Sequence, residues 1–155
     1  MAKLELKSPR IENRKAFHDY FIESKLECGI ALLGSEVKSL RMGLAQISEA
    51  FVEIKGRDLF LQNAHIDPYT QSAIVYNHPA RRPRRLLAHR REIVKLQEAT
   101  EGTSMTIVPL AIYFKEGRAK VEIGVARGKK AFDKRATIKK KESDRELRRA
   151  MTKRQ

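Results

Sequence analysis

Apolar residues alternate with polar ones in several parts of the chain, which is the spacing of half-buried β-strands. Aromatic and β-branched residues open a first such segment at 20–27. A second alternates from Phe51, turns at 56–58 and returns to residue 66, as a hairpin does. A third runs through 105–114, turns, and returns through 119–126 as a second hairpin. Pro109 interrupts the third segment and predicts a sheet edge or a bulge there.

Short helices are expected between these strands. Asn13 can cap one turn that ends at His18. Ser35 can cap a second helix, which Gly43 would end. Residues 86–99 are apolar on one face and basic on the other, which predicts a third helix. The preceding segment, 70–85, is interrupted by prolines and is expected to form a long loop.

About six short strands with two or three short helices indicate a mainly β fold. The order of elements predicts a closed or half-closed antiparallel barrel of the size of an OB domain. The apolar pattern nearly vanishes after Ala126. We therefore expect an OB-like barrel domain at 1–130, and a basic C-terminal tail at 131–155 that is disordered when free. Ser143 and Glu146 fit a capping box, which predicts a helix from that point when the tail folds on a partner.

Charge sharpens this division. The chain has 155 residues and a formal net charge of +14. Residues 127–155 carry +9 and residues 81–91 carry +6, so the other 115 residues carry −1. Six arginines in the second stretch repel one another unless something neutralises them. This distribution favours a polyanionic partner that is bound at two defined places.

Other features of the composition restrict where the protein works. A single cysteine, Cys28, excludes an intramolecular disulfide and fits a reducing compartment such as the cytoplasm. No apolar run approaches the roughly 20 residues of a membrane span. The first residues lack the apolar core of a signal peptide. We expect a cytoplasmic protein with no membrane partner.

The residues offer little for catalysis. The four histidines lack the spacing of a zinc site, one cysteine cannot form a C-x-x-C pair, and no phosphate-binding loop is present, so no metal or cofactor is expected. Cys28 as a nucleophile and Glu23 with Glu27 as a carboxylate pair are weak alternatives, so an enzyme is not expected. Glu27 could instead accept hydrogen bonds from the edges of bases.

With catalysis disfavoured, RNA recognition remains as the function that the residues fit. Arginine binds phosphates bidentately and stacks on bases, and flat side chains suit unpaired bases. His78, beside the arginines of the loop, is favoured as an RNA contact. For Tyr20 and Tyr69 a place in the core is as plausible as stacking. A structural ribosomal or rRNA-binding protein is the alternative to an RNA-binding adaptor.

Five blocks of sequence carry a more specific signal, at 13–20, 34–41, 65–69, 84–87 and 121–135. They resemble the SsrA-binding protein (small protein B, SmpB) family, in one order from about residue 11 to 150. The resemblance implies an RNA-binding adaptor in bacterial trans-translation. Such a protein binds transfer-messenger RNA (tmRNA) and brings it to stalled ribosomes, where the nascent peptide is tagged. Elongation factor Tu and alanyl-tRNA synthetase act on the same RNA, and the adaptor itself is expected to be a monomer.

The resemblance also implies which residues touch RNA. The tRNA-like domain of tmRNA would be held by Asn13, Glu27, Leu87 and Lys120 with basic groups around them. Together with the basic loop, the candidate RNA-binding residues are Asn13, Arg14, Lys15, His18, Glu27, Lys38, Arg41, His78, Arg81, Arg82, Arg84, Arg85, Leu87, Lys120, Arg127, Lys129 and Lys130.

The tail would enter the decoding centre of the small subunit and the empty mRNA channel, where 16S rRNA surrounds it. Phe132 stands where the family often has histidine or tyrosine, so a ring for stacking remains but the polar tip is lost. The candidate tail residues are Phe132, Asp133, Lys134, Arg135, Lys139, Lys140, Lys141, Arg145, Arg148 and Arg149.

Overall fold

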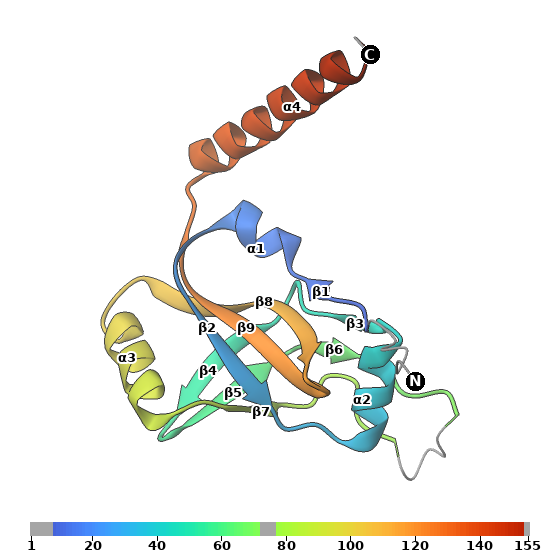
Figure 1. Ribbon diagram of the computed structural model, residues 1–155. Helices are drawn as coiled ribbons and strands as arrows, with labels where there is room; N and C mark the ends of the chain where they lie inside the picture. The colour runs from blue at the N-terminus through green and yellow to red at the C-terminus, as the bar shows by residue number, and fades with distance from the viewer. Residues whose placement is uncertain (1–7, 72–76, 154–155) are drawn as a thin grey trace.

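The computed structural model of the chain describes residues 8–71 and 77–153. Six antiparallel strands follow one another in the order β8, β4, β5, β7, β2, β9, and β9 pairs with β8 to close the ring (Figure 1). The expected mainly β, closed antiparallel barrel of about six strands is therefore confirmed. The strands are β1 (Ile11–Glu12), β2 (Tyr20–Ile30), β3 (Ala45–Gln46), β4 (Phe51–Lys55), β5 (Asp58–Gln62), β6 (His65–Ile66), β7 (Arg84–Leu87), β8 (Met105–Lys115) and β9 (Arg118–Gly128).

The long strands β8 and β9 form the hairpin expected at 105–126, and β4 with β5 forms the one expected from Phe51. A register shift lies between Pro109 and Ala111, so the bulge predicted at the proline is confirmed. Proline has no N–H to donate to a partner strand, and a bulge is where a sheet tolerates that loss. The short strands β3 and β6 pair outside the ring.

Alternating inward side chains fill the barrel. Val121, Ile123 and Val125 of β9 are all buried, as their period-two spacing predicts. A Cβ added to Gly124 would lie 2.9 Å from Ile22 Cγ2 and 3.0 Å from Leu110 Cδ1, so only glycine allows β9 to approach its neighbours there. Burial raises the pKa of Cys28 to about 12, and an inert core thiol is the result.

Two of the predicted short helices stand where the sequence placed them. Helix α1 (Arg14–Asp19) has Asn13 as its N-cap, and the Asn13 carboxamide oxygen accepts from the Ala16 N–H at 3.1 Å. Helix α2 (Gly34–Arg41) ends before Gly43, whose φ of +75° suits glycine at that position. Ser35 was predicted to cap α2, and this is wrong. Leu33 holds the N-cap position, where its N–H donates to the Glu36 carboxylate at 2.9 Å.

The predicted helix at 86–99 is wrong in its first part. Residues 84–87 form strand β7, and helix α3 (Arg90–Thr100) begins only after it. Arg84 and Leu86 point into the barrel while Arg85 and Leu87 point out. With an arginine buried and a leucine exposed, the sequence of 84–87 shows no alternation of polar and apolar residues, which conceals the strand. The rest of the predicted loop at 70–85 is irregular where it is described, and residues 72–76 lie outside the described residues.

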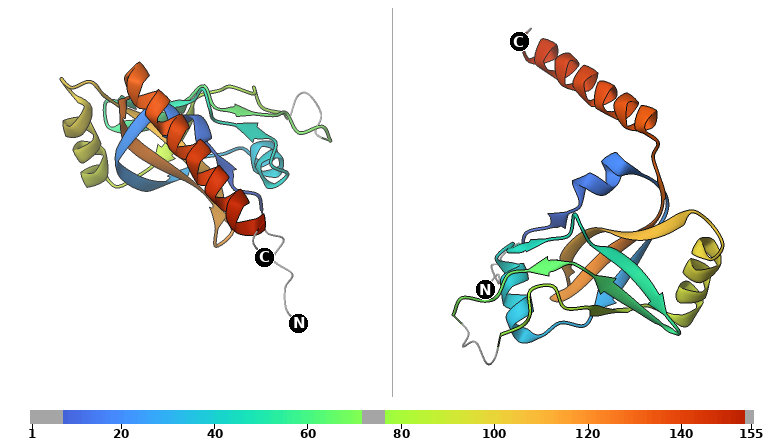
Figure 2. Two further views of the ribbon diagram at one scale, coloured as in Figure 1. Left: turned by 90° about the horizontal axis from the view of Figure 1, so that it is seen from above. Right: turned by 180° about the vertical axis from the view of Figure 1, so that it is seen from behind.

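The tail forms helix α4 (Ala131–Lys153), which projects away from the barrel beyond α1 (Figures 1 and 2). Ser143 was expected to cap a helix, but it lies inside α4, so the capping box is wrong. The lysines, arginines, glutamates and alanines on both sides of Ser143 are good helix formers and extend the helix in both directions. Disorder of the tail in the free protein stays a prediction. No helix among the described residues is long and apolar enough to cross a membrane.

Candidate nucleic-acid interface

Three of the candidate RNA-binding residues meet on one outer face of the barrel. Gly29 of β2 pairs with Leu87 of β7 on one side and with Lys120 of β9 on the other. Glu27 stands two residues before Gly29 and so projects from the same face of β2. The barrel therefore brings together Glu27, Leu87 and Lys120, which lie far apart in the sequence. We call this group the barrel face.

The carboxylate of Glu27 is held in place by two residues of β8. The Tyr113 hydroxyl donates to Glu27 Oε2, and Lys115 Nζ lies 3.5 Å from Oε1. The hydrogen bond from Tyr113, with help from Lys115, lowers the pKa of Glu27. Burial and the same hydrogen bond raise the pKa of Tyr113 to about 12. Glu27 is thus an ionised, oriented acceptor at neutral pH, as recognition of base amino groups requires.

Helix α2 adjoins the barrel face. Val37 lines an open hollow of about 340 Å³ together with Leu87, Arg118 and Lys120. On the exposed side of α2, Lys38 Nζ lies 5.3 Å from the centre of the Tyr69 ring. Arg41 Cζ lies 5.4 Å from that of Phe114. Cation–π contacts of this kind hold long basic side chains in defined positions.

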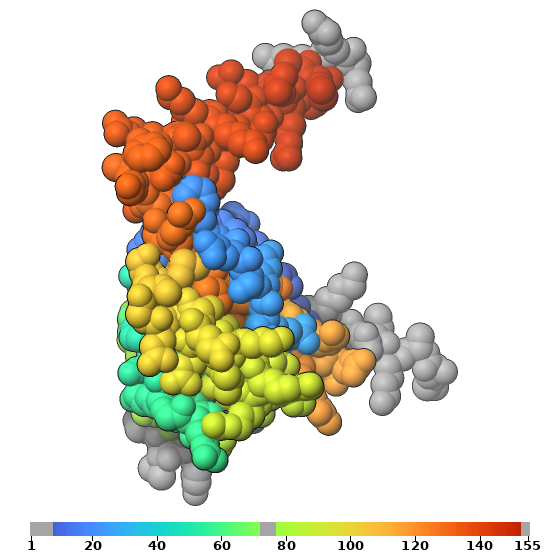
Figure 3. All heavy atoms as spheres, turned by 90° about the vertical axis from the view of Figure 1, so that its left-hand side faces the viewer, coloured from blue at the N-terminus to red at the C-terminus, as the bar shows by residue number. Residues whose placement is uncertain are grey.

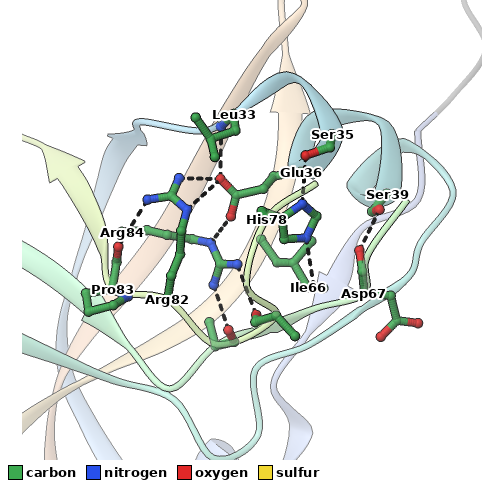
Figure 4. A network of polar contacts seen from close by, with 12 residues as sticks. Leu33, Ser35, Glu36, Ser39, Ile66, Asp67, His78, Arg82, Pro83 and Arg84 are labelled. Carbon is green, nitrogen blue, oxygen red and sulfur yellow. Dashed lines mark hydrogen bonds and ion pairs between the residues drawn. The ribbon is translucent and has the colours of Figure 1, made fainter. Parts of the chain in front are cut away.

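The buried side of α2 is fixed by Glu36, whose side chain has no exposed surface. Its carboxylate accepts from Arg82 and from Arg84 Nε, besides the Leu33 N–H (Figure 4). Burial by itself would raise the pKa of Glu36, but the hydrogen bonds from Arg82, Leu33 and Arg84 outweigh it and the net pKa is lowered. Glu36 therefore pairs with two of the six arginines of the basic stretch from within the chain and offsets one of their two charges.

Arg84 was predicted to contact RNA, and this is wrong, since its side chain is fully buried. Besides Glu36, the guanidinium donates to the Ala64 carbonyl at 2.7 Å and to the Ala80 carbonyl at 3.0 Å. Burial lowers the pKa of Arg84, and Glu36 offsets part of that shift. Arg84 therefore connects Glu36 of α2 with the backbone at Ala64 and Ala80 inside the protein.

The RNA contact predicted for His78 is wrong for the same reason. Only 4% of the residue is exposed, and its two ring nitrogens are both occupied. Nε2 lies 3.0 Å from the Ile66 carbonyl, and Nδ1 lies 2.8 Å from Ser35 Oγ (Figure 4). Since a carbonyl oxygen only accepts, Nε2 carries the proton. His78 therefore connects Ser35 of α2 with Ile66 of β6. Ser39 Oγ of α2 adds a hydrogen bond to the Asp67 carbonyl at 2.7 Å.

Asn13 is likewise buried, and direct contact with RNA through its side chain is wrong. Its amide nitrogen donates to the Pro109 carbonyl at 2.8 Å and to the Ile47 carbonyl at 3.3 Å, while its oxygen caps α1. The side chain connects α1 to the bulge of β8. Any effect of Asn13 on RNA binding passes through the placement of α1.

A second group of candidates gathers where β9 leaves the barrel. Arg127 Cζ and Lys129 Nζ lie 5.3 and 4.9 Å from the centre of the exposed Phe21 ring. Lys129 Nζ also donates to the Phe17 carbonyl and to Thr137 Oγ1 of α4. This cluster lies between α1 and α4, next to the exposed candidates Arg14 and Lys130.

Most of the remaining candidates lie in local polar pairs at the surface. Lys15 donates to Glu49 at 2.6 Å, and this hydrogen bond raises the pKa of Lys15. His18 Nδ1 donates to Asp19 at 2.8 Å, which lowers the pKa of Asp19. Two candidates of the basic stretch are exposed. Arg81 donates to Asn63 at 2.8 Å, and Arg85 donates to Asp58 at 2.9 Å.

Among the described residues, the polar contacts of helix α4 with the rest of the chain lie near its start. Lys134 Nζ lies 3.6 Å from Asp19, and Thr137 receives the hydrogen bond from Lys129. Phe132 is 61% exposed. The side chains at 138–152 are all exposed, which includes the candidates Lys139, Lys140, Lys141, Arg145, Arg148 and Arg149.

Sequence reasoning missed Glu36, Tyr113 and Phe21. Glu36 shares the buried side of α2 with Leu40, four residues on, and this spacing of an acid with an apolar residue was the available signal. Nothing local marks Tyr113, because its partner Glu27 lies 86 residues away. Among the described residues no group of three or more His, Cys, Asp or Glu side chains is placed to hold a metal ion.

A closed six-stranded barrel with basic and aromatic side chains on its outer face, extended by a cationic helix, defines a small barrel protein that suits a polyanionic partner. The chain belongs to the SmpB protein family, whose model matches residues 10–153.

Individual relatives agree with this assignment. The SsrA-binding protein of Syntrophotalea carbinolica is 51% identical over 139 residues, covering 90% of this chain and 92% of that protein. The SsrA-binding protein of Streptomyces coelicolor is 49% identical over 152 residues, covering 98% and 95%. A solved structure described as "tmRNA-SmpB: a journey to the center of the bacterial ribosome" has a TM-score of 0.68 and 47% sequence identity, covering 79% of this chain and 86% of that one.

Proposed function

We propose that this protein is an RNA-binding adaptor for ribosome rescue. It binds the tRNA-like domain of tmRNA through the barrel and brings this RNA to stalled ribosomes for trans-translation. Membership of the SmpB family and the likeness to a tmRNA–SmpB structure support this function. The protein works in the cytoplasm as a monomer and catalyses no reaction itself. Alanyl-tRNA synthetase and elongation factor Tu act on the same RNA.

The observation that carries the proposal is the separation of two cationic surfaces. Leu87 and Lys120 of the barrel face line one hollow together with Val37 of α2, and Glu27 projects from the same face. The exposed side of α2 adds Lys38 and Arg41. Helix α4, which carries the second set of basic residues, projects away from the barrel, as Figure 1 shows. We assign the tRNA-like domain to the first surface and the decoding centre with the empty mRNA channel to the second.

Removal of residues 131–155 tests this division. Because no strand pair of the described chain involves α4, and the polar contacts described for it are with Asp19 of α1 and with Lys129, we expect the truncated protein to keep every strand pair. We expect its affinity for tmRNA to stay close to that of the full chain, while tagging of nascent peptides on stalled ribosomes is abolished. A full-length variant with Lys139, Lys140 and Lys141 changed to alanine is the matched control, and it should bind tmRNA normally but tag poorly.

Two outcomes would contradict the proposal. Loss of tmRNA binding by the truncated protein would place the RNA on α4 rather than on the barrel. Recovery of one copy of the protein per ribosome under all growth conditions would identify a structural ribosomal protein instead. Binding of the full chain should also depend steeply on salt, with a loss of about 10³–10⁵ in affinity between 50 and 200 mM if 6–10 phosphates are contacted.

A further inference from the structure

We propose that the RNA-binding surface continues past Leu87 into a second hollow, lined by Arg57, Arg85 and Arg90, which takes the sugar–phosphate backbone of the same RNA. This inference rests on the proposed function and deepens it. Arg57 and Arg90 belong to none of the sequence blocks that resemble the SmpB family. Arg90 follows Leu87 by three residues, and the structure brings Arg57 to both.

The second hollow has a volume of about 490 Å³ and lies where the β4–β5 turn, the end of β7 and the first turn of α3 meet. Figure 3 looks onto this side of the molecule, where the green atoms near residue 57 lie close to the lime atoms of β7 and the start of α3. Leu87 lines this hollow and also the one that contains Lys120. With 53% of its surface exposed, Leu87 forms a ridge between two basic depressions.

The charge of the second hollow favours an anion. Three arginines line it together with one acid, Asp58. Asp58 accepts from Arg85 in an exposed pair, and such pairs are weak enough to exchange for a phosphate. Within the described part of the chain, Arg57 and Arg90 are in no ion pair, so both guanidinium groups are available.

The geometry favours an RNA backbone over an acidic protein. Arg85 and Leu87 project from the same side of β7, about 7 Å apart. Leu87 and Lys120 are separated by one intervening strand, or about 10 Å. Basic groups therefore stand on both sides of one apolar side chain. A strand of RNA matches that order, because its phosphates can meet arginine forks while a sugar or base packs on the leucine.

Two double variants separate the hollow from the general charge of the protein. Arg57→Ala with Arg90→Ala removes two cations from the hollow. Arg91→Ala with Lys95→Ala removes two exposed cations from α3 that do not line it. The net charge of the two proteins is the same. Equal urea midpoints for both variants and for the unchanged chain would establish that all three fold alike.

Binding to tmRNA is then measured as a function of salt concentration. The slope of log K against log salt should become shallower by about 2 in the hollow variant, since each lost phosphate contact removes roughly 0.9. Its affinity near 0.1 M salt should fall by roughly 10- to 60-fold, and that of the α3 control by less than about threefold. Asp58→Asn should bind about two- to fivefold more tightly, because Arg85 is freed.

The outcomes are distinguishable. The inference is overturned if both double variants lose the same affinity and the same slope, or if Asp58→Asn leaves the affinity unchanged. It is also overturned if the hollow variant loses affinity for poly-glutamate but not for tmRNA, since the hollow would then serve an acidic protein. Failure of the unchanged chain to bind tmRNA would instead overturn the proposed function.

Discussion

Residues 81–91 contain six arginines and no acid, and residues 131–153 contain nine basic residues and four acidic ones. By composition the first segment is the more strongly cationic. In the folded chain, Arg82 and Arg84 of that segment are bound to Glu36, and Arg85 is bound to Asp58. In α4, by contrast, the side chains at 138–152 all face solvent.

The comparison shows that net charge and available charge are different quantities. Arg82 and Arg84 of the first segment build the scaffold that positions α2, and they can do so because Glu36 and several carbonyl groups satisfy them. The basic residues of α4 have few such partners and stay free for phosphates. Substitutions in the two segments should therefore affect different properties of the protein.

The largest effect on stability is expected for Glu36→Gln. The amide cannot neutralise Arg84, and a buried charge without its partner costs about 3–5 kcal/mol. That is a large part of the roughly 5–15 kcal/mol by which a domain is usually stable. Urea unfolding followed by circular dichroism measures the change. Glu142→Gln in the exposed α4 is the matched control and should stay within about 0.5 kcal/mol. Equal costs for the two variants would mean that the buried cluster does not hold the fold.

Lowering the pH should reduce the stability that Glu36 contributes to the fold. The pKa of Glu36 is lowered in the folded chain, so its contribution to stability is complete above the unfolded value of about 4.3 and is lost as the pH falls through the folded value. The difference in unfolding free energy between the unchanged chain and Glu36→Gln should shrink below that pH, by at most about 1.4 kcal/mol per pH unit. A difference that stays constant down to pH 3 would show that the pKa of Glu36 is not lowered by the fold.

Arg84→Lys and Arg85→Lys compare neighbouring residues on opposite sides of β7. A lysine at 84 cannot reach Glu36, the Ala64 carbonyl and the Ala80 carbonyl with one fork, and leaving such buried groups unpaired costs about 1–3 kcal/mol. The same change at the exposed Arg85 should cost less than about 0.5 kcal/mol. Thermal or urea unfolding of both variants measures the contrast. A larger loss for Arg85→Lys would reverse the assignment of the inner and outer faces.

Much of the fold follows from local spacing, but the buried polar cluster does not. The alternation in 105–126 and the glycine at 43 predict their elements because each depends on neighbours in the sequence. Local spacing could not predict the burial of Arg84, because that burial depends on Glu36, 48 residues away. Glu27 and Lys120 were assigned to the site by resemblance, and only the pairing of β2 with β9 explains why they stand together. The errors at Arg84 and His78 have one cause, which is that polar residue types were read as surface residues. Asn13 was assigned by resemblance, and its burial depends on carbonyl groups of Ile47 and Pro109 that are distant in the sequence.

The smallest effect on stability is expected for Lys139, Lys140 and Lys141 changed together to alanine. All three side chains are exposed on α4, and alanine is the best helix former, so the unfolding free energy should change by no more than about 0.5 kcal/mol. The affinity for ribosomes should nevertheless fall, with a salt dependence that is shallower by roughly 1 for each lost phosphate contact. Sedimentation with ribosomes at several salt concentrations measures this, and urea unfolding provides the stability. A variant that is destabilised by more than about 1 kcal/mol would show that the middle of α4 packs on the barrel. The basic residues of α4 would then support the fold, as Arg82 and Arg84 do, rather than stay free for phosphates.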